Sequence, residues 1–181
     1  MSLLVLLDVN AAFDTVDYKL LLDILERYFV IRDKVLKSYI SYLTERTQTF
    51  HVETEKSKTF AFNCSLSQGS VVGPLQFIAY TEDLLSVIEE NKVDPYRYAD
   101  DGQLNDHLLL YDVGAAIPNM ENCVDTVHRW HASKHLQLNP SKAAVIWFGT
   151  NAIPRKLQSV DLSLHVGADT SAPVDTGATL V

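Results

Sequence analysis

The stretch Pro95-Tyr96-Arg97-Tyr98-Ala99-Asp100-Asp101-Gly102 places adjacent carboxylates at the end of a short apolar and aromatic run. Such a run is typical of a β-strand, and Gly102 would permit the tight backbone geometry of a hairpin. Because side chains alternate along strands, we expect Asp100 and Asp101 to project in opposite directions from the hairpin tip. Adjacent carboxylates repel one another unless a cation lies nearby, and a divalent metal ion is the usual one. Taken alone, such a pair is usually no more than an ordinary solvated turn.

The composition is that of a globular protein with a sizeable core. The chain has 181 residues, 47% of them hydrophobic, which argues against disorder. It carries 15 basic and 23 acidic residues, so its formal net charge is −8. That sign is unfavourable for a chain that must bind nucleic acid phosphates by itself. The first apolar run ends at Asp8, too early for a signal segment or a membrane span, so we expect a soluble intracellular protein.

Cysteine and histidine residues give little sign of a metal site. Cys64 and Cys123 lie far apart and outside any zinc-binding spacing, so we expect two buried free thiols rather than a disulfide. His128, His131 and His135 share one face of a predicted helix, which could bind a transition metal. No suitably placed Cys or Glu completes that set, so a solvated polar face is the favoured interpretation.

The order of expected elements is mixed. The apolar run over residues 2–7 predicts a strand buried on both faces, which delivers Asp8 to its C-terminal end. Periodicity and turn signals predict helices over 20–28, 35–43, 75–88 and 120–136, a hairpin of 47–52 and 59–62 around the turn 53–58, a second hairpin of 95–98 and 104–110, and strands over 143–148 and 160–166. Residues 167–178 are expected to be loosely ordered. This order predicts an α+β fold with an antiparallel central sheet.

Four motifs in this order resemble the palm motifs of reverse transcriptases, in the form found in non-LTR (LINE-type) retrotransposons. They are Leu7-Asp8-Val9-Asn10-Ala11-Ala12-Phe13-Asp14-Thr15-Val16-Asp17, Gln68-Gly69-Ser70-Val71-Val72-Gly73-Pro74-Leu75, Tyr98-Ala99-Asp100-Asp101, and Leu136-Gln137-Leu138-Asn139-Pro140-Ser141-Lys142. The resemblance implies a polymerase palm-type antiparallel sheet with helices packed on one face, lacking most of the fingers and thumb. Residues 1–150 would be the palm region, and 151–181 would begin the connection between palm and thumb.

The resemblance implies an RNA-directed DNA polymerase that uses an RNA template, a DNA primer and dNTPs, with no membrane and no evident protein partner. A primer 3′-hydroxyl attacks an α-phosphorus, and two Mg²⁺ ions, for which Mn²⁺ could substitute, can activate the hydroxyl and stabilise the departing pyrophosphate. Asp8 and Asp100 are the implied metal ligands, and Asp101 has a supporting or shared role. Lys142 matches the family's lysine near the pyrophosphate, where it is a candidate proton donor, although an ordinary surface lysine is the alternative.

A second group of residues is implied in nucleotide binding: Val9, Phe13, Gln68 and Gly69. Phe13 matches the aromatic residue that lies beneath the incoming sugar and excludes a 2′-hydroxyl, although a core aromatic is the alternative. Gln68 and Gly69 would lie along the nucleotide and the template, where the missing side chain of glycine lets the backbone approach closely.

The match departs from the family pattern before the glycine loop and after the catalytic hairpin. Ser65-Leu66-Ser67 stands where the family usually has Gly-Val-Pro, and Gly102 and Asn105 replace the usual Thr and Tyr. The absent fingers and thumb would have carried most of the positive surface, which accounts for the acidic balance. The alternative function is therefore a catalytically inactive retrotransposon remnant, and an unrelated α+β domain with coincidental motifs is a third interpretation. Binding of Mg²⁺ or Mn²⁺ would distinguish the enzyme from the remnant.

Overall fold

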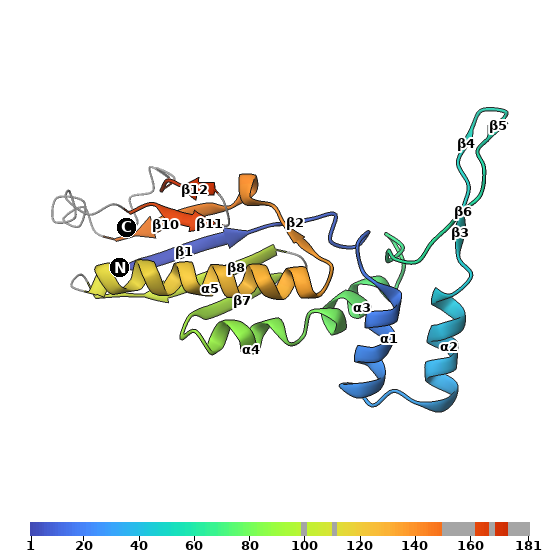
Figure 1. Ribbon diagram of the computed structural model, residues 1–181, viewed down its shortest axis with the longest axis horizontal. Helices are drawn as coiled ribbons and strands as arrows, with labels where there is room; N and C mark the ends of the chain where they lie inside the picture. Colours follow the sequence, from blue (N-terminus) through green and yellow to red (C-terminus); the bar gives the residue numbers. More distant parts are fainter. Residues whose placement is uncertain (99–100, 110–111, 150–161, 167–168, 174–181) are drawn as a thin grey trace. The chain divides into compact units, whose positions relative to one another are not determined.

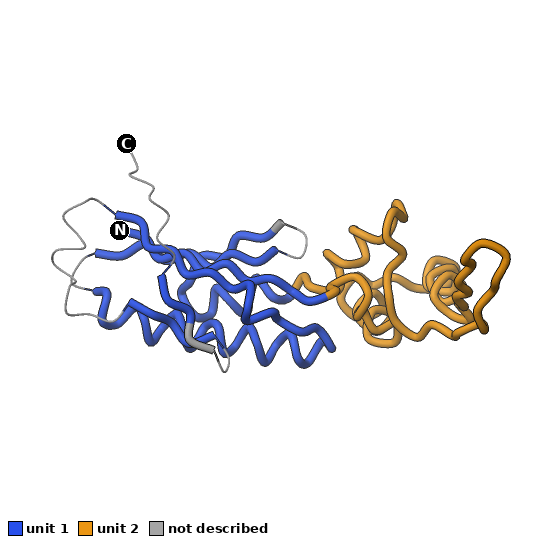
Figure 2. The backbone as a smooth tube through the Cα atoms, turned by 90° about the horizontal axis from the view of Figure 1, so that it is seen from above, with its two compact units in different colours: residues 1–10, 83–181 blue, residues 11–82 orange. Residues whose placement is uncertain are grey.

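The computed structural model describes residues 1–98, 101–109, 112–149, 162–166 and 169–173. The chain forms two compact units, shown in different colours in Figure 2. Unit 1 consists of Met1–Asn10 and Asp83–Val181, and unit 2 consists of Ala11–Glu82. Among the helices of these described residues, none is long and apolar enough to cross a membrane. The sequence motifs are divided between the two units, so each unit is considered by itself.

The centre of unit 1 is a four-stranded antiparallel sheet in the order β10-β1-β8-β7 (Figure 1). Its strands are β1 (Ser2–Leu7), β7 (Asp94–Tyr98), β8 (Asp101–His107) and β10 (Ala144–Phe148). The first strand lies between β8 and β10, with Leu7 opposite Gly102 and Leu6 opposite Ala144. The predicted antiparallel central sheet is confirmed. The hairpin β7–β8 is also confirmed, although β8 begins at Asp101 and ends at His107 rather than running from 104 to 110.

The expectation that β1 is buried on both faces was wrong for one face. Leu3, Val5 and Leu7 are buried, whereas Leu4 and Leu6 between them are only half-buried. This alternation is typical of an antiparallel sheet whose two faces are unequally covered. A continuous apolar sequence therefore did not distinguish a fully enclosed strand from one with a partly open face.

The helices of unit 1 are α4 (Leu84–Glu89) and α5 (Val113–Ser133). The long helix α5 packs against α4, β9 and β11 and runs beside the sheet in Figure 1. It buries Met120, Cys123 and Val127, as its helical spacing predicted. The helix begins at Val113 rather than at the predicted residue 120, and its first turns also bury Val113 and Ala116. Pro118 lies inside the helix, beyond its first turn, where it removes one backbone hydrogen bond.

Short strands complete unit 1. The pair β2 (Val9–Asn10) and β9 (Gln137–Leu138) continues directly from β1, and β11 (Leu164–Val166) pairs with β12 (Asp169–Ser171). The strand expected over 160–166 is present only from Leu164, and residues 160–161 lie outside the described part. The expectation of loose order over 167–178 was wrong for 169–171, which form β12. Residues 167–168 and 174–178 lie outside the described residues.

Unit 2 contains the predicted pair of helices and a hairpin. Its elements are α1 (Tyr18–Arg27), α2 (Asp33–Leu43), β3 (Thr47–Gln48), β4 (His51–Val52), β5 (Glu55–Lys56), β6 (Phe60–Ala61) and α3 (Gly73–Tyr80). Asp17 caps α1, because its Oδ1 accepts a hydrogen bond from the backbone N–H of Leu20 at 2.9 Å, as expected of an N-terminal Asp.

Two boundaries in unit 2 differ from the prediction. The hairpin turn is shorter than residues 53–58, because Glu55 and Lys56 pair with Val52 and His51. The helix expected over 75–88 is two helices, α3 and α4, separated at Thr81–Asp83. The Thr81 hydroxyl donates to the carbonyl of Phe77 at 2.8 Å. Such a side-chain bond competes with the backbone ladder and is common where a helix ends.

The cysteines are both free, as predicted, but only one is buried. Cys123 is enclosed in α5, and burial raises the pKa of its thiol to about 11. Cys64 is exposed, so the prediction of two buried thiols was wrong for this residue. Its backbone forms an isolated antiparallel β-bridge with Asp17.

Gln76 lies on α3 at 2% exposure, and its Oε1 and Nε2 have no hydrogen-bond partner among the described residues. An unsatisfied buried amide costs about 1–3 kcal/mol, and leucine has a similar volume without the polar atoms. We therefore expect Gln76→Leu to raise the free energy of unfolding by about 1–3 kcal/mol. Urea denaturation followed by circular dichroism measures this, with the exposed Gln137→Leu as the matched control. A loss of stability in Gln76→Leu would show that the amide has a partner.

Candidate active site

Asp8 lies at the point where β1 ends and β2 begins. Its side chain is 27% exposed, and its backbone carbonyl accepts a hydrogen bond from Asn139 N–H at 2.9 Å. The flanking pairs, Leu7 with Gly102 and Val9 with Leu138, tie this point to β8 and to β9. The carboxylate is therefore attached to a backbone that is paired on both sides of it.

Asp101 is the first residue of β8 and is exposed. It pairs with Tyr98, so it belongs to the strand rather than to the hairpin tip, where it was expected. Because Leu7 lies opposite Gly102, the next step of the antiparallel register brings Asp8 toward Asp101. The predicted metal ligand Asp100 lies outside the described residues.

Lys142 forms an ion pair with Asp8. It is the last residue of a single 3₁₀ turn, Pro140–Lys142, that follows β9. Its Nζ lies 3.1 Å from Oδ2 of Asp8, and its side chain is 65% exposed. The structure thus brings together two residues, Asp8 and Lys142, that are far apart in the sequence and were predicted to share one site.

The chemistry of Asp8 fits a hard divalent cation. Its Oδ2 is buried, and the charged group beside it is the Lys142 ammonium, with Nζ at 3.1 Å. A buried carboxylate oxygen with unused acceptor capacity is a suitable ligand for Mg²⁺ or Mn²⁺, which prefer oxygen donors. Within the described residues, no group of three or more acidic, His or Cys side chains gathers, and Asp100 lies beyond them.

The residues implied in nucleotide binding fall in both units. Val9, in unit 1, is 7% exposed and paired with Leu138, so its side chain is not open to a ligand. In unit 2, the half-buried ring of Phe13 stacks on Phe77 with centroids 4.8 Å apart and planes at 16°. Phe13 therefore packs against the core and also keeps part of its ring accessible, which leaves both interpretations of this aromatic open.

Gln68 and Gly69 form the turn before α3. Gln68 is exposed, and Gly69 has a φ of +79°, a conformation that side chains other than glycine rarely adopt. The loop then closes on α3, because the Gly73 N–H donates to Ser70 Oγ at 2.9 Å. A Cβ at Gly73 would lie 2.7 Å from that same hydroxyl. The backbone conformation at Gly69 and the close contact at Gly73 therefore explain why the motif has glycine at these two positions.

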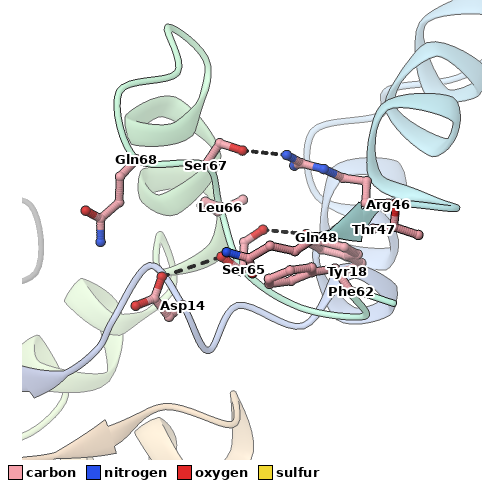
Figure 3. A pocket seen from close by; sticks show the side chains of 10 residues that line it. All are labelled: Asp14, Tyr18, Arg46, Thr47, Gln48, Phe62, Ser65, Leu66, Ser67 and Gln68. Atoms are coloured by element: carbon pink, nitrogen blue, oxygen red, sulfur yellow. Dashed lines mark hydrogen bonds between the residues drawn. The ribbon is translucent and has the colours of Figure 1, made fainter. Parts of the chain in front are cut away.

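A polar cavity of about 340 Å³ lies beside this loop in unit 2 (Figure 3). Its lining residues are Asp14, Tyr18, Arg46, Thr47, Gln48, Phe62, Ser65, Leu66, Ser67 and Gln68. Arg46 Nη2 donates to Ser67 Oγ at 2.5 Å, and in Figure 3 Ser67 points toward Arg46 while Gln68 points away. Sequence reasoning missed Arg46, because an isolated arginine before a hairpin carries no motif.

Tyr18 and Arg46 line this cavity and donate hydrogen bonds to the loop before Gly69. The Tyr18 hydroxyl donates to the backbone carbonyl of Ser65 at 2.6 Å, and burial raises the pKa of Tyr18. The Arg46 guanidinium lies 5.2 Å from the centroid of the Tyr42 ring, a cation–π arrangement. Residues 65–68, immediately before Gly69, are therefore held by Tyr18 of α1 and by Arg46, which lies between α2 and β3.

His128 and His131 lie on α5, whereas His135 follows the end of that helix at Ser133, so the helix predicted to run to residue 136 ends earlier. Within the described residues these histidines do not form a metal face. His128 and His135 are exposed, whereas His131 is 5% exposed. Its Nδ1 lies 2.8 Å from the Val127 carbonyl, so the neutral ring donates there. Burial lowers the pKa of His131 to about 4, and the charges of Arg97 and His128 act in the same direction. The expected solvated polar face was therefore wrong for His131.

The depressed pKa of His131 predicts a loss of stability in acid. The unfolded chain binds this proton near pH 6.5 and the folded chain only near pH 4, so the unfolded state takes up more protons between these values. The contribution of neutral His131 to the free energy of unfolding is complete above about pH 6.5, and it falls by about 2 kcal/mol between pH 7.5 and 5. Urea denaturation at both pH values measures it, with His131→Leu as the variant that lacks the titration. An equal pH dependence in both proteins would contradict the assignment.

Comparison with known families identifies the class of the chain. The family model described as "Reverse transcriptase (RNA-dependent DNA polymerase)" matches residues 2–162. The chain therefore belongs to the reverse transcriptase family, and the family predicted from the four motifs is confirmed.

The RNA-directed DNA polymerase from mobile element jockey of Drosophila melanogaster is a relative of this chain. The two are 26% identical over 147 residues, which is 78% of this chain and 16% of that protein. This chain thus spans only a small part of the length of the curated relative that it matches.

Solved structures show the same fold at low sequence identity. Apo telomerase from Candida tropicalis, truncated from its C-terminal domain, matches with a TM-score of 0.62 and 9% identity, covering 94% of this chain and 35% of that one. Another apo telomerase structure from Candida tropicalis matches with a TM-score of 0.58 and 11% identity, covering 83% and 29%. The predicted palm-type combination of antiparallel sheet and helices is therefore confirmed.

Proposed function

We propose that this chain is the palm region of an RNA-directed DNA polymerase, which transfers a nucleotide from a dNTP to a primer 3′-hydroxyl on an RNA template. The observation that carries the proposal is the end of β1. There, in a chain of the reverse transcriptase family, the buried Oδ2 of Asp8 lies 3.1 Å from the Lys142 ammonium, directly after the β1 residues that pair with β8. Residues 1–150 would be the palm region, and 151–181 would begin the connection to further parts of the polymerase.

The proposed metal ligands are Asp8 and Asp100, with Asp101 in a supporting or shared role. Members of this family generally use divalent metals, and the buried oxygen of Asp8 fits that use. A pair of Mg²⁺ or Mn²⁺ ions bound there would activate the primer hydroxyl and neutralise charge on the leaving pyrophosphate. The protein's contribution is to hold Asp8 directly after β1 and Asp101 at the start of β8, so that little reorganisation of these two carboxylates is needed during transfer.

Other side chains have proposed roles toward the nucleotide. Lys142 would donate a proton or hydrogen bonds to the departing pyrophosphate, because an exposed ammonium can reach phosphate oxygens. Phe13 would lie beneath the incoming sugar, with Phe77 holding its ring in place. Gln68 and the backbone at Gly69 would contact the nucleotide and template. These roles follow the family resemblance and the exposure of each group.

Primer extension on an RNA template tests the proposal. The reaction would contain a DNA primer, dNTPs, Mg²⁺ or Mn²⁺ and low salt, since a net charge of −8 disfavours binding to nucleic acid. Wild-type chain and Asp100→Asn would be compared after circular dichroism shows both to be folded. Extension that the substitution abolishes supports the polymerase. A folded wild-type chain that extends no primer would contradict autonomous activity and would favour an inactive remnant.

A further inference from the structure

The ion pair between Lys142 and Asp8 involves the same oxygen that a metal ion would use. Lys142 Nζ lies 3.1 Å from Asp8 Oδ2, an oxygen that is buried from solvent. A metal ion and an ammonium cannot both approach one carboxylate oxygen closely without repelling each other. The lysine and the metal therefore exclude or weaken each other at Oδ2.

The backbone places Lys142 at this position. Asn10 pairs with Gln137 and Val9 with Leu138, and the Asn139 N–H donates to the carbonyl of Asp8 itself at 2.9 Å. The 3₁₀ turn then begins, with Lys142 N–H bonded to the carbonyl of Asn139 at 3.2 Å. The base of the lysine is thus fixed to the backbone of its carboxylate partner.

The ammonium end of the lysine is free to leave. The side chain of Lys142 is 65% exposed and that of Asp8 27% exposed. An ion pair whose ammonium is this open to water contributes little stability, because solvent screens it and holding a long side chain costs entropy. A cation of higher charge would displace the ammonium, whereas the turn that carries Lys142 would stay in place.

We propose that Lys142 is an internal counter-ion of Asp8, which competes with a divalent metal ion and is released when that ion binds. The release provides a free ammonium beside the metal site when the metal is in place. A triphosphate oxygen is the chemical group that such an ammonium would then take. This inference rests on the proposed function, and it adds that metal binding and the availability of Lys142 are coupled.

The coupling predicts a higher metal affinity when the lysine is removed. We expect Lys142→Met to bind Mn²⁺ roughly two- to fivefold more tightly than the wild type, because the competing ion pair is a weak one. Calorimetric titration of the whole chain with Mn²⁺, without nucleic acid, measures the dissociation constants. Lys142→Gln is a second variant, and Lys92→Met is the matched control, since Lys92 is an exposed lysine of the same unit.

The coupling also predicts that metal exposes the lysine. Acetylation of Lys142 by an amine-reactive ester, followed by peptide mass spectrometry, should become faster when Mg²⁺ is added to the wild type. Acetylation of Lys92 should not change. In Asp8→Asn, Lys142 should react rapidly with or without Mg²⁺, because the carboxylate that holds it is gone.

The outcomes separate this inference from the proposed function. Tighter Mn²⁺ binding by both lysine variants, together with Mg²⁺-dependent acetylation, supports the counter-ion. Equal Mn²⁺ affinity in wild type and variants overturns it, even if primer extension succeeds. Failure of every variant to bind Mn²⁺ overturns it together with the metal site. Extension failing while the coupling is present would remove the polymerase proposal and leave the counter-ion.

Discussion

Asp8→Asn is expected to lower the rate of RNA-templated primer extension by about 10²–10⁴-fold, because a metal ligand supplies several kcal/mol of transition-state stabilisation. The fold should survive, since asparagine has the same shape and the structural bond at this position uses the backbone carbonyl of Asp8. Single-turnover extension with saturating dNTP measures the chemical step.

Asp94→Asn is the matched control for this loss. Asp94 is an exposed carboxylate of the same sheet, so its substitution removes the same charge without touching the end of β1. We expect its rate to stay within about twofold of the wild type, as for surface substitutions away from a site. An Asp8→Asn chain that is folded and as active as Asp94→Asn would remove Asp8 from the reaction.

Phe77→Ala is expected to destabilise unit 2 by about 3–5 kcal/mol, the usual cost of deleting a buried phenylalanine. Phe77 is 1% exposed and its ring stacks on Phe13, so alanine leaves a cavity and removes the support of a predicted nucleotide-binding ring. Thermal and urea denaturation of the whole chain would report this loss. A domain has only about 5–15 kcal/mol of stability in total, so a large part of it depends on this ring.

Leu75→Ala is the control on the same helix. Leu75 is 64% exposed, and its truncation should change the free energy of unfolding by less than about 0.5 kcal/mol. Equal and small effects of Phe77→Ala and Leu75→Ala would contradict the packing of α3 described above. A large effect of Phe77→Ala alone would support it.

The central sheet could be predicted because its signals are local. An apolar run, a turn and a return strand defined β1 and the β7–β8 hairpin, and Leu7 and Tyr98 fell at the ends of strands as expected. The exact start of β8 could not be predicted, because Asp101 pairs with Tyr98 through cross-strand hydrogen bonds. Those bonds depend on the register and leave no mark in the local sequence.

The break between α3 and α4 was hidden for a different reason. Residues 75–88 keep an apolar helical pattern throughout, so periodicity alone predicts one helix. The side-chain bond from Thr81 to the Phe77 carbonyl marks the place where the helix ends. A threonine inside an apolar pattern is common, so its presence was too weak a signal.

The candidate site was predicted as a set of residues but not as a set of contacts. The motifs named both Asp8 and Lys142, yet their 3.1 Å ion pair depends on the pairing of β2 with β9. That ladder joins residues more than 120 positions apart, as Val9 pairs with Leu138. The burial of His131 could not be predicted either. Three histidines at helical spacing differ in burial only once the fold covers one of them, and their spacing does not show which one.

Iron-mediated backbone cleavage tests the central claim, that Asp8 and the β7–β8 hairpin form a divalent metal site, most directly. Fe²⁺ with ascorbate and peroxide replaces Mg²⁺ and generates radicals that cut the chain close to the bound ion. The account predicts cuts next to residue 8 and residues 100–101, suppressed by excess Mg²⁺ and absent in Asp8→Asn. Cuts elsewhere, or cuts at these positions that neither Mg²⁺ nor the substitution reduces, would contradict it.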